Sequence, residues 1–172
     1  MAASHPFDPP VQAEPATDDT ARFTAFLDAH HVMSLATCGT DGPHAANVFF
    51  ARDGFSLLWV SDPQTQHSRA VEINPLVAAT VAPDYRDFDE ICGVQLCGVA
   101  YRITDAAERH AARGLLEARY PFLQRQSDRP GVKEAYDAAD FYRLVPRKIV
   151  IIDNKRGFGH KDTLDLHALT RP

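Results

Sequence analysis

The residues best suited to chemistry lie just after positions 61–63, the sequence Ser-Asp-Pro, where we expect a helix over residues 63–73 to begin. Its first turn carries a hydroxyl, an amide and an imidazole, on Thr65, Gln66 and His67. Backbone N–H groups in a first turn have no partner within the helix, and the helix dipole adds positive potential. The pattern therefore indicates either a site for a phosphate or similar anion, or an ordinarily capped helix exposed to solvent.

Other signatures of catalysis or metal binding are absent or weak. The sequence contains no G-x-S-x-G, H-E-x-x-H or C-x-x-C motif and no P-loop. Cys92 and Cys97 would point to opposite faces of a strand, so we expect buried thiols and no metal site. The sequence Gly-Phe-Gly at 157–159 predicts a turn. His44 and His160 are weak candidates for proton transfer, and the catalytic residues stay unassigned.

The spacing of apolar residues predicts the elements that must position these side chains. A helix beginning at residue 17 or 18 should bury a stripe made of Phe23, Phe26, Leu27 and His30. A second helix over 106–119, capped by Asp105, should turn Leu115 and Leu116 inward. We expect strands over residues 30–38, 44–51, 55–60, 76–82, 91–104, 141–145 and 148–152.

Short connections between these strands favour antiparallel pairing, and Asp53-Gly54 predicts a hairpin. The strand over 76–82 is continuous and apolar, so we expect it to be buried. Pro146 is expected to divide the last apolar run into two strands. About six strands with helices inserted between them predict a mainly β (α+β) fold, a closed or nearly closed barrel.

Length and charge restrict the class of protein. The 172 residues predict one domain over residues 17–172, preceded by an acidic, proline-rich tail over residues 1–16. The net charge is −5, but four acids lie in the first twenty residues, so the remainder is nearly neutral and unsuited to nucleic acid. We expect no membrane partner, because no apolar run approaches the roughly 18 residues of a spanning helix. Three cysteines and no signal peptide predict a cytoplasmic protein.

The run over residues 45–81, AANVFFARDGFSLLWVSDPQTQHSRAVEINPLVAATV, resembles the pyridoxamine 5′-phosphate oxidase-related superfamily of FMN-binding split barrels. GVQLCG at 93–98 and IDNKRGFGHK at 152–161 resemble its small, uncharacterised YhbP-like branch. The resemblance covers residues 20–163 and implies a six-stranded antiparallel split β-barrel that forms a homodimer. FMN would then lie in a groove at the dimer interface.

The resemblance also implies cofactor contacts at particular positions of this chain. Asn47, Val48 and Phe49 would border the flavin ring, and Gln95 would contact the flavin. Val60 and Ser61 would lie beside the ribityl chain and phosphate, and Thr65, Gln66 and His67 would take the phosphate. Gln66 and His67 stand where relatives often have arginine and lysine, and Cys92 stands where a relative has arginine. Fewer charge-assisted hydrogen bonds imply weaker phosphate binding, unless Arg69 folds back to compensate.

The function implied is that of an FMN-binding flavoprotein, an oxidoreductase whose substrate and electron donor the sequence does not identify. Two alternatives stay open. The same fold could bind or degrade haem, which would need a histidine or other axial ligand facing the groove. It could also serve as a non-catalytic flavin-binding or purely structural dimer.

Overall fold

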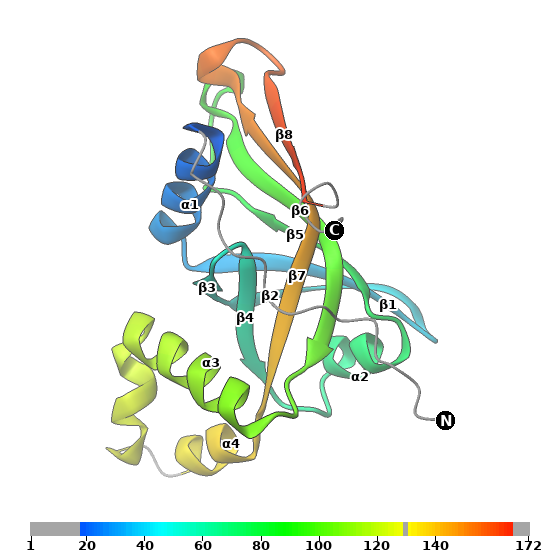
Figure 1. Cartoon of the computed structure of the whole chain (residues 1–172), viewed down its shortest axis with the longest axis vertical. Helices are drawn as coiled ribbons and strands as arrows, with labels where there is room; N and C mark the ends of the chain where they lie inside the picture. The colour runs from blue at the N-terminus through cyan, green and yellow to red at the C-terminus, as the bar shows by residue number, and fades with distance from the viewer. Residues whose placement is uncertain (1–17, 129–130, 167–172) are drawn as a thin grey trace.

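The computed structural model describes residues 18–128 and 131–166, which form an eight-stranded, curled antiparallel sheet with helices around it (Figure 1). The strand order is β2-β1-β5-β6-β7-β4-β3, and β8 pairs with β7. The tail predicted over residues 1–16 lies outside the described residues. Among the described residues, no helix is both long enough and apolar enough to cross a membrane.

The elements have the following bounds. The helices are α1 (Asp18–Ala29), α2 (Gln66–Ile73), α3 (Ala106–Arg119) and α4 (Val132–Ala138), with short 3₁₀ segments η1 (Phe88–Glu90), η2 (Pro121–Asp128) and η3 (Asn154–Arg156). The strands are β1 (Val32–Gly39), β2 (Gly42–Phe49), β3 (Ala51–Asp53), β4 (Ser56–Ser61), β5 (Leu76–Val81), β6 (Cys92–Arg102), β7 (Asp140–Asp153) and β8 (Lys161–Asp165).

Two hairpins and one interruption explain why the barrel is split. β1 pairs with β2, and β3 pairs with β4 around the predicted Asp53-Gly54 turn. The strand predicted over 44–51 is interrupted at Phe50, whose side chain is buried. After this point the chain leaves β2, and β4 pairs with β7 instead. β2 and β3 therefore end the sheet as edge strands, which confirms the split-barrel prediction with eight strands in place of six.

β7 is one continuous strand, so the predicted division at Pro146 is wrong. The register between β6 and β7 shifts at Cys97 and Gly98, and Pro146 pairs with Gly98 at this bulge. A Cβ on residue 98 would lie 2.2 Å from the Val145 carbonyl oxygen, so the close approach of the two strands requires glycine. Bulges tolerate proline because the regular hydrogen-bond ladder is already interrupted there.

Two apolar clusters stabilise the fold. The larger lies inside the curled sheet and includes Phe23 and Leu27 of α1, both fully buried as predicted. The smaller packs α3 and α4 against β3, β4 and β7. Leu116 is fully buried in it, but Leu115 is 38% exposed, so the inward prediction is wrong for Leu115. α3 is an amphipathic helix at the surface, and such a helix turns only one stripe of side chains toward the core.

β5 is buried on one face only, although its continuous apolar sequence predicted a buried strand. Val77 is 5% exposed, whereas its neighbour Leu76 is 56% exposed. The whole strand alternates in this way. The outward positions are apolar or small, so the sequence alone does not distinguish them from core positions.

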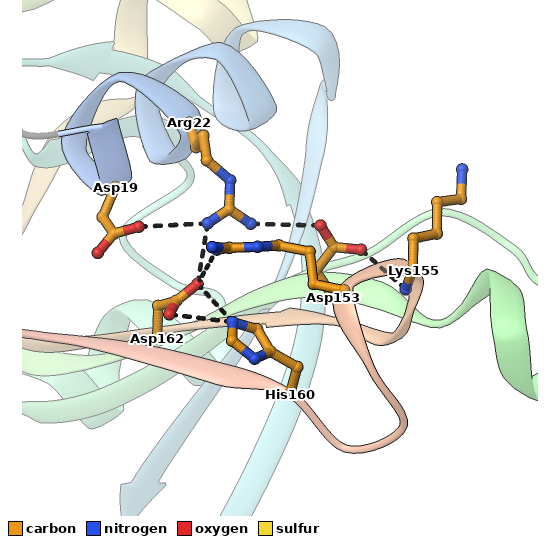
Figure 2. A network of polar contacts seen from close by, with 7 residues as sticks. Asp19, Arg22, Asp153, Lys155, His160 and Asp162 are labelled. Carbon is orange, nitrogen blue, oxygen red and sulfur yellow. Dashed lines mark hydrogen bonds and ion pairs between the residues drawn. The ribbon is translucent and has the colours of Figure 1, made fainter.

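The turn between β7 and β8 is fastened to α1 by a network of ion pairs, which we call the clasp (Figure 2). The guanidinium of Arg22 donates to the carboxylates of Asp162 (2.8 Å), Asp153 (3.2 Å) and Asp19 (3.2 Å). The imidazole Nε2 of His160 lies 3.1 Å from the Asp162 carboxylate. The clasp thus joins the two ends of the described chain and gives His160 a structural partner.

The same turn contains the predicted glycine pair. Gly157 and Gly159 have φ angles of 139° and 75°, which confirms the prediction of a turn with positive φ. The Asn154 side chain accepts a hydrogen bond from the Gly159 N–H (3.0 Å) and donates one to the Phe88 carbonyl (2.6 Å). The IDNKRGFGHK segment therefore has a local structural role, and it leads directly into β8.

Candidate functional site

The segment between β4 and α2 folds through local hydrogen bonds. The Asp62 carboxylate accepts from the Gln64 N–H (2.7 Å), and the Thr65 hydroxyl donates to the Asp62 carbonyl (2.9 Å). The Thr65 hydroxyl also accepts from the Ser68 N–H, so Thr65 is the N-cap of α2. The helix therefore begins at Gln66, three residues later than predicted. Pro63 belongs to the preceding turn.

His67 lies at the centre of a small polar cluster. It is only 8% exposed, and its Nε2 lies 2.8 Å from the Ser61 hydroxyl and 3.2 Å from the Thr65 hydroxyl. Its ring stacks parallel to that of His44 on β2, with 6.3 Å between the ring centroids. The structure thus brings together three of the predicted phosphate-end residues. Val60 is half-buried and packs against the smaller apolar cluster instead.

The environment of His67 favours its neutral form. Burial lowers the pKa of this imidazole, and the charge of the neighbouring His44 lowers the pKa further. A neutral imidazole can donate one hydrogen bond and accept another. At neutral pH the site therefore offers a phosphate a hydrogen-bonding His67 in place of a permanent cation.

Gln66 and Arg69 lie on the exposed side of α2. Both line a hollow of about 130 Å³ between the helix and the β1–β2 turn, with His44 on its wall. The Arg69 guanidinium donates to the Gln64 carbonyl (2.6 Å), so this side chain does fold back toward the start of the helix. His44 lines this hollow although the sequence did not place it at the phosphate end, whereas Arg69 was already considered there as a compensating charge.

The residues predicted at the flavin ring lie on both sides of the edge strand β2. Val48 packs against the larger apolar cluster, whereas Asn47 and Phe49 face outward. The Asn47 side-chain oxygen accepts from the Ser34 hydroxyl (2.7 Å). Phe49 is 51% exposed and makes an edge-to-face contact with Tyr120 at 5.3 Å. β2 can therefore offer a ligand both its outward side chains and its unpaired backbone edge.

Gln95 lies on the same outward face as Asn47. The register aligns Asn47 with Ser34, Ser34 with Thr80 and Thr80 with Gln95 across four strands. Neighbouring strands are about 4.8 Å apart, so Asn47 and Gln95 are separated by roughly 14 Å. The structure brings the two predicted residues onto one face but not into contact.

This outward face of β2, β1, β5 and β6, the uncharged face, contains no charged side chain. Its exposed residues are Val32, Ser34, Ala36, Cys38, Pro43, Ala45, Asn47, Phe49, Leu76, Ala78, Thr80, Gln95 and Cys97. The expectation of a buried thiol is therefore wrong for Cys97, because alternate residues of β6 point outward. Among the described residues, no group of His, Cys, Asp and Glu is placed to hold a metal ion.

Comparison with known proteins identifies the family. The model of the pyridoxamine 5′-phosphate oxidase family matches residues 19–141. A UPF0306 protein of Yersinia pestis is 30% identical over 146 residues, which cover 84% of this chain and 91% of the relative.

Two solved structures share the fold at low sequence identity. A heme binding protein of Mycobacterium smegmatis has a TM-score of 0.68 at 20% identity over 92% of this chain; the chain spans 61% of that protein. A FAD-binding protein of Mesorhizobium loti has a TM-score of 0.59 at 19% identity, over 75% of this chain and 90% of that one. Together with the matched family model, the split barrel and its edge strand show that the chain belongs to the pyridoxamine 5′-phosphate oxidase family.

Proposed function

We propose that the protein binds FMN at an interface between two copies of the chain and acts as an oxidoreductase. Membership of the family supports this choice of cofactor. Bound FMN would supply the redox chemistry, and the chain would bind and orient it and exclude water.

The observation that carries the proposal is the uncharged face. A four-strand surface that is exposed and free of charge is typical of an interaction site. Asn47, Phe49 and Gln95, which the family resemblance assigns to the flavin, all lie on this face. A second copy packed here by two-fold symmetry would cover the face and lie against these three residues.

The residues present suit a flavin mononucleotide. The free edge of β2 offers backbone donors and acceptors for the polar rim of the ring, and Phe49 offers an apolar surface. At the other end, Ser61, Thr65 and Gln66 supply hydroxyl and amide groups for the ribityl chain and phosphate.

The visible absorption spectrum of the freshly purified protein and a titration with FMN test this proposal. We expect the two absorption bands of a bound flavin, or saturable quenching of FMN fluorescence. The paired substitution Thr65→Ala with His67→Ala should weaken FMN binding by more than about tenfold, equivalent to roughly 1.4 kcal/mol. A protein that neither carries FMN nor binds it in the titration would contradict the proposal.

A haem is the second candidate, because an exposed histidine lies in an aromatic cluster. His31 makes an edge contact with Tyr120 at 5.8 Å, and the half-exposed Phe49 and Phe122 pack on the same ring. An imidazole beside apolar rings could supply an axial ligand. An intense Soret band that is lost in His31→Ala would favour haem over FMN.

A further inference from the structure

Two phenylalanine rings are exposed at the end of the sheet where β7 turns into β8, at the top of Figure 1. Phe158 is 82% exposed and Phe88 is 70% exposed, and the two rings meet edge to face with 6.4 Å between their centroids. We call them the tip pair. Neither ring belongs to the two apolar clusters of the described residues. Adjoining apolar rings left in water are typical of a surface that another molecule covers.

The backbone holds the tip pair in place. The Asn154 carbonyl accepts the Gly157 N–H (3.1 Å), and the Gly157 carbonyl accepts the His160 N–H (2.9 Å). The Asn154 side chain also donates to the Phe88 carbonyl, so one residue positions the segments that carry both rings. The clasp fastens the same turn to α1 (Figure 2). Rings that are already held lose little conformational entropy when a partner covers them, which favours binding.

A second set of exposed rings lies beside β2. Phe49 and Phe122 are 51% and 47% exposed, and both pack on Tyr120. We call these three residues the ring patch. The Tyr120 hydroxyl hydrogen-bonds to the backbone carbonyls of His31 and Phe50, so the ring patch is also held in place.

The strand register places the tip pair and the ring patch at the same end of the uncharged face. Ser34 of β1 and Gln95 of β6 belong to one row across this face, and the two strands run in the same direction. Phe49 pairs with Val32, which precedes Ser34, and Cys92 precedes Gln95. The ring patch therefore lies on the β2 side of this end, and the tip pair lies beyond the start of β6, on the other side.

Two-fold symmetry relates these two sides. A two-fold axis along the strands, through the middle of the uncharged face, would lay the β6 side of one copy over the β2 side of the other. Both sets of rings lie at the same end, so this rotation would bring the tip pair of each copy to the ring patch of its partner. An interface of this symmetry makes every contact twice and covers all the exposed rings at once.

We propose that the tip pair of each copy docks on the ring patch of a second copy and closes one end of the flavin groove. The inference rests on the proposed FMN-binding dimer and deepens it, because the partner's Phe158 then lies beside Phe49, the residue expected at the flavin ring. The Gly-Phe-Gly turn thereby acquires a role in assembly. Aromatic rings favour edge-to-face and offset contacts, and both sets already make such contacts within one chain.

Cross-linking between two single-cysteine chains tests the contact. The three native cysteines are replaced by serine, and Phe122→Cys is then introduced into one chain and Phe158→Cys into another. After the two proteins are mixed, we expect a short bis-maleimide to join residue 122 of one chain to residue 158 of the other, as identified by mass spectrometry.

Ile73→Cys in place of Phe158→Cys is the matched control. Ile73 is also exposed (58%), but it lies near the β1–β2 turn, at the opposite end of the sheet. We expect no link between residues 122 and 73. A link to residue 73 without one to residue 158 would show that the copies meet in the other orientation, and it would overturn the inference.

Loss of the ring at position 158 should weaken the dimer. We expect Phe158→Ser to raise the dissociation constant of the dimer at least about tenfold, because buried aromatic anchors dominate the energy of interfaces. Ile73→Ser removes an exposed apolar side chain elsewhere and should change this constant by less than about twofold. Sedimentation equilibrium measures both, and a Phe158→Ser dimer as tight as the wild type would contradict the docking.

The outcomes separate this contact from the proposed function. If the protein is a dimer that binds FMN but residues 122 and 158 are not joined, the contact is wrong and the proposed function stands. If they are joined in a dimer that binds no FMN, the contact stands and the cofactor proposal fails. A protein that remains a single chain contradicts both.

Discussion

His67 shows how its surroundings change what a residue can contribute to this site. The family resemblance implied a phosphate ligand at this position, with an imidazole in place of a permanent cation, but the side chain is buried, hydrogen-bonded to Ser61 and stacked on His44. These contacts stabilise the neutral ring, because a buried charge loses its hydration. The permanent charge near the helix start comes instead from Arg69, which folds back along α2.

The stability of the protein should depend on the protonation of His67. Because the pKa of His67 in the folded protein lies below 6.5, the unfolded chain takes up this proton first as the pH falls. The free energy of unfolding should therefore decrease from about pH 6.5 down to the folded-state pKa. Urea unfolding between pH 8 and pH 5 should show a larger loss of stability in the wild type than in His67→Gln, where this group is absent. Parallel pH profiles would contradict the assignment.

Gly98 provides a test of packing at the bulge. Gly98→Ala would place a Cβ 2.2 Å from the Val145 carbonyl oxygen, so we expect a loss of about 2 kcal/mol or more in the free energy of unfolding. Gly114→Ala is the matched control, because no atom lies within 4 Å of its added Cβ. Alanine in this helix interior should raise stability by about 0.5–1 kcal/mol. Equal effects in urea titrations would contradict the bulge argument.

At the scale of elements, the clasp explains how a short terminal strand is held. β8 has five residues and pairs only with β7, so its hydrogen bonds alone would leave it easily frayed. Arg22 of α1 adds ion pairs to Asp153 before the turn and Asp162 after it. The hydrogen bond from Arg22, with help from His160, lowers the pKa of Asp162, so the carboxylate stays ionised over the physiological range.

Removing Arg22 should loosen β8 without disturbing the centre of the sheet. In Arg22→Ala we expect faster amide hydrogen exchange in residues 161–165 and unchanged exchange in β6, measured by mass spectrometry. Arg86→Ala is the control, because it also removes an arginine but one that does not belong to the clasp. If β8 exchanges equally fast in both variants, the clasp does not hold the strand.

Local signals predicted the elements well, and long-range pairing accounts for most of the errors. Asp53-Gly54 and the Asp105 cap depend on neighbouring residues, and both are confirmed; the Asp105 carboxylate accepts the Glu108 N–H at 2.8 Å. The continuity of β7 through Pro146 depends on a bulge opposite Gly98, which is distant in sequence.

In the candidate site, too, local contacts were predicted and long-range contacts were not. The cluster of Ser61, Thr65 and His67 is local in sequence and was predicted as a group. The hollow was not predicted from the sequence, because His44 reaches it only when the β1–β2 hairpin packs against α2.

At the scale of the whole molecule, the distribution of charge supports the proposed dimer. The ion pairs of the described residues lie in the clasp, on the helices and between strand residues such as Arg143 and Asp53, whereas the uncharged face has none. Leaving such a face in water would be unfavourable and would invite association. The proposed interface between two copies would account for both its composition and the placement of Asn47 and Gln95 on it.

A charge introduced into this face should prevent association. Ala78→Lys places an ammonium at the centre of β5, where a partner would have to desolvate it, so we expect a shift from dimer to monomer. Ala118→Lys makes the same change on the exposed surface of α3 and should leave the assembly intact. Size-exclusion chromatography with light scattering measures both. If Ala78→Lys and Ala118→Lys have the same mass, the face is not the interface.

Sedimentation velocity of the FMN-loaded protein, followed in the visible band of oxidised flavin, tests the central claim most directly. The account predicts that flavin absorbance sediments with a species of twice the 19.0 kDa chain mass. Flavin that sediments freely, or with a single 19.0 kDa chain, would contradict it.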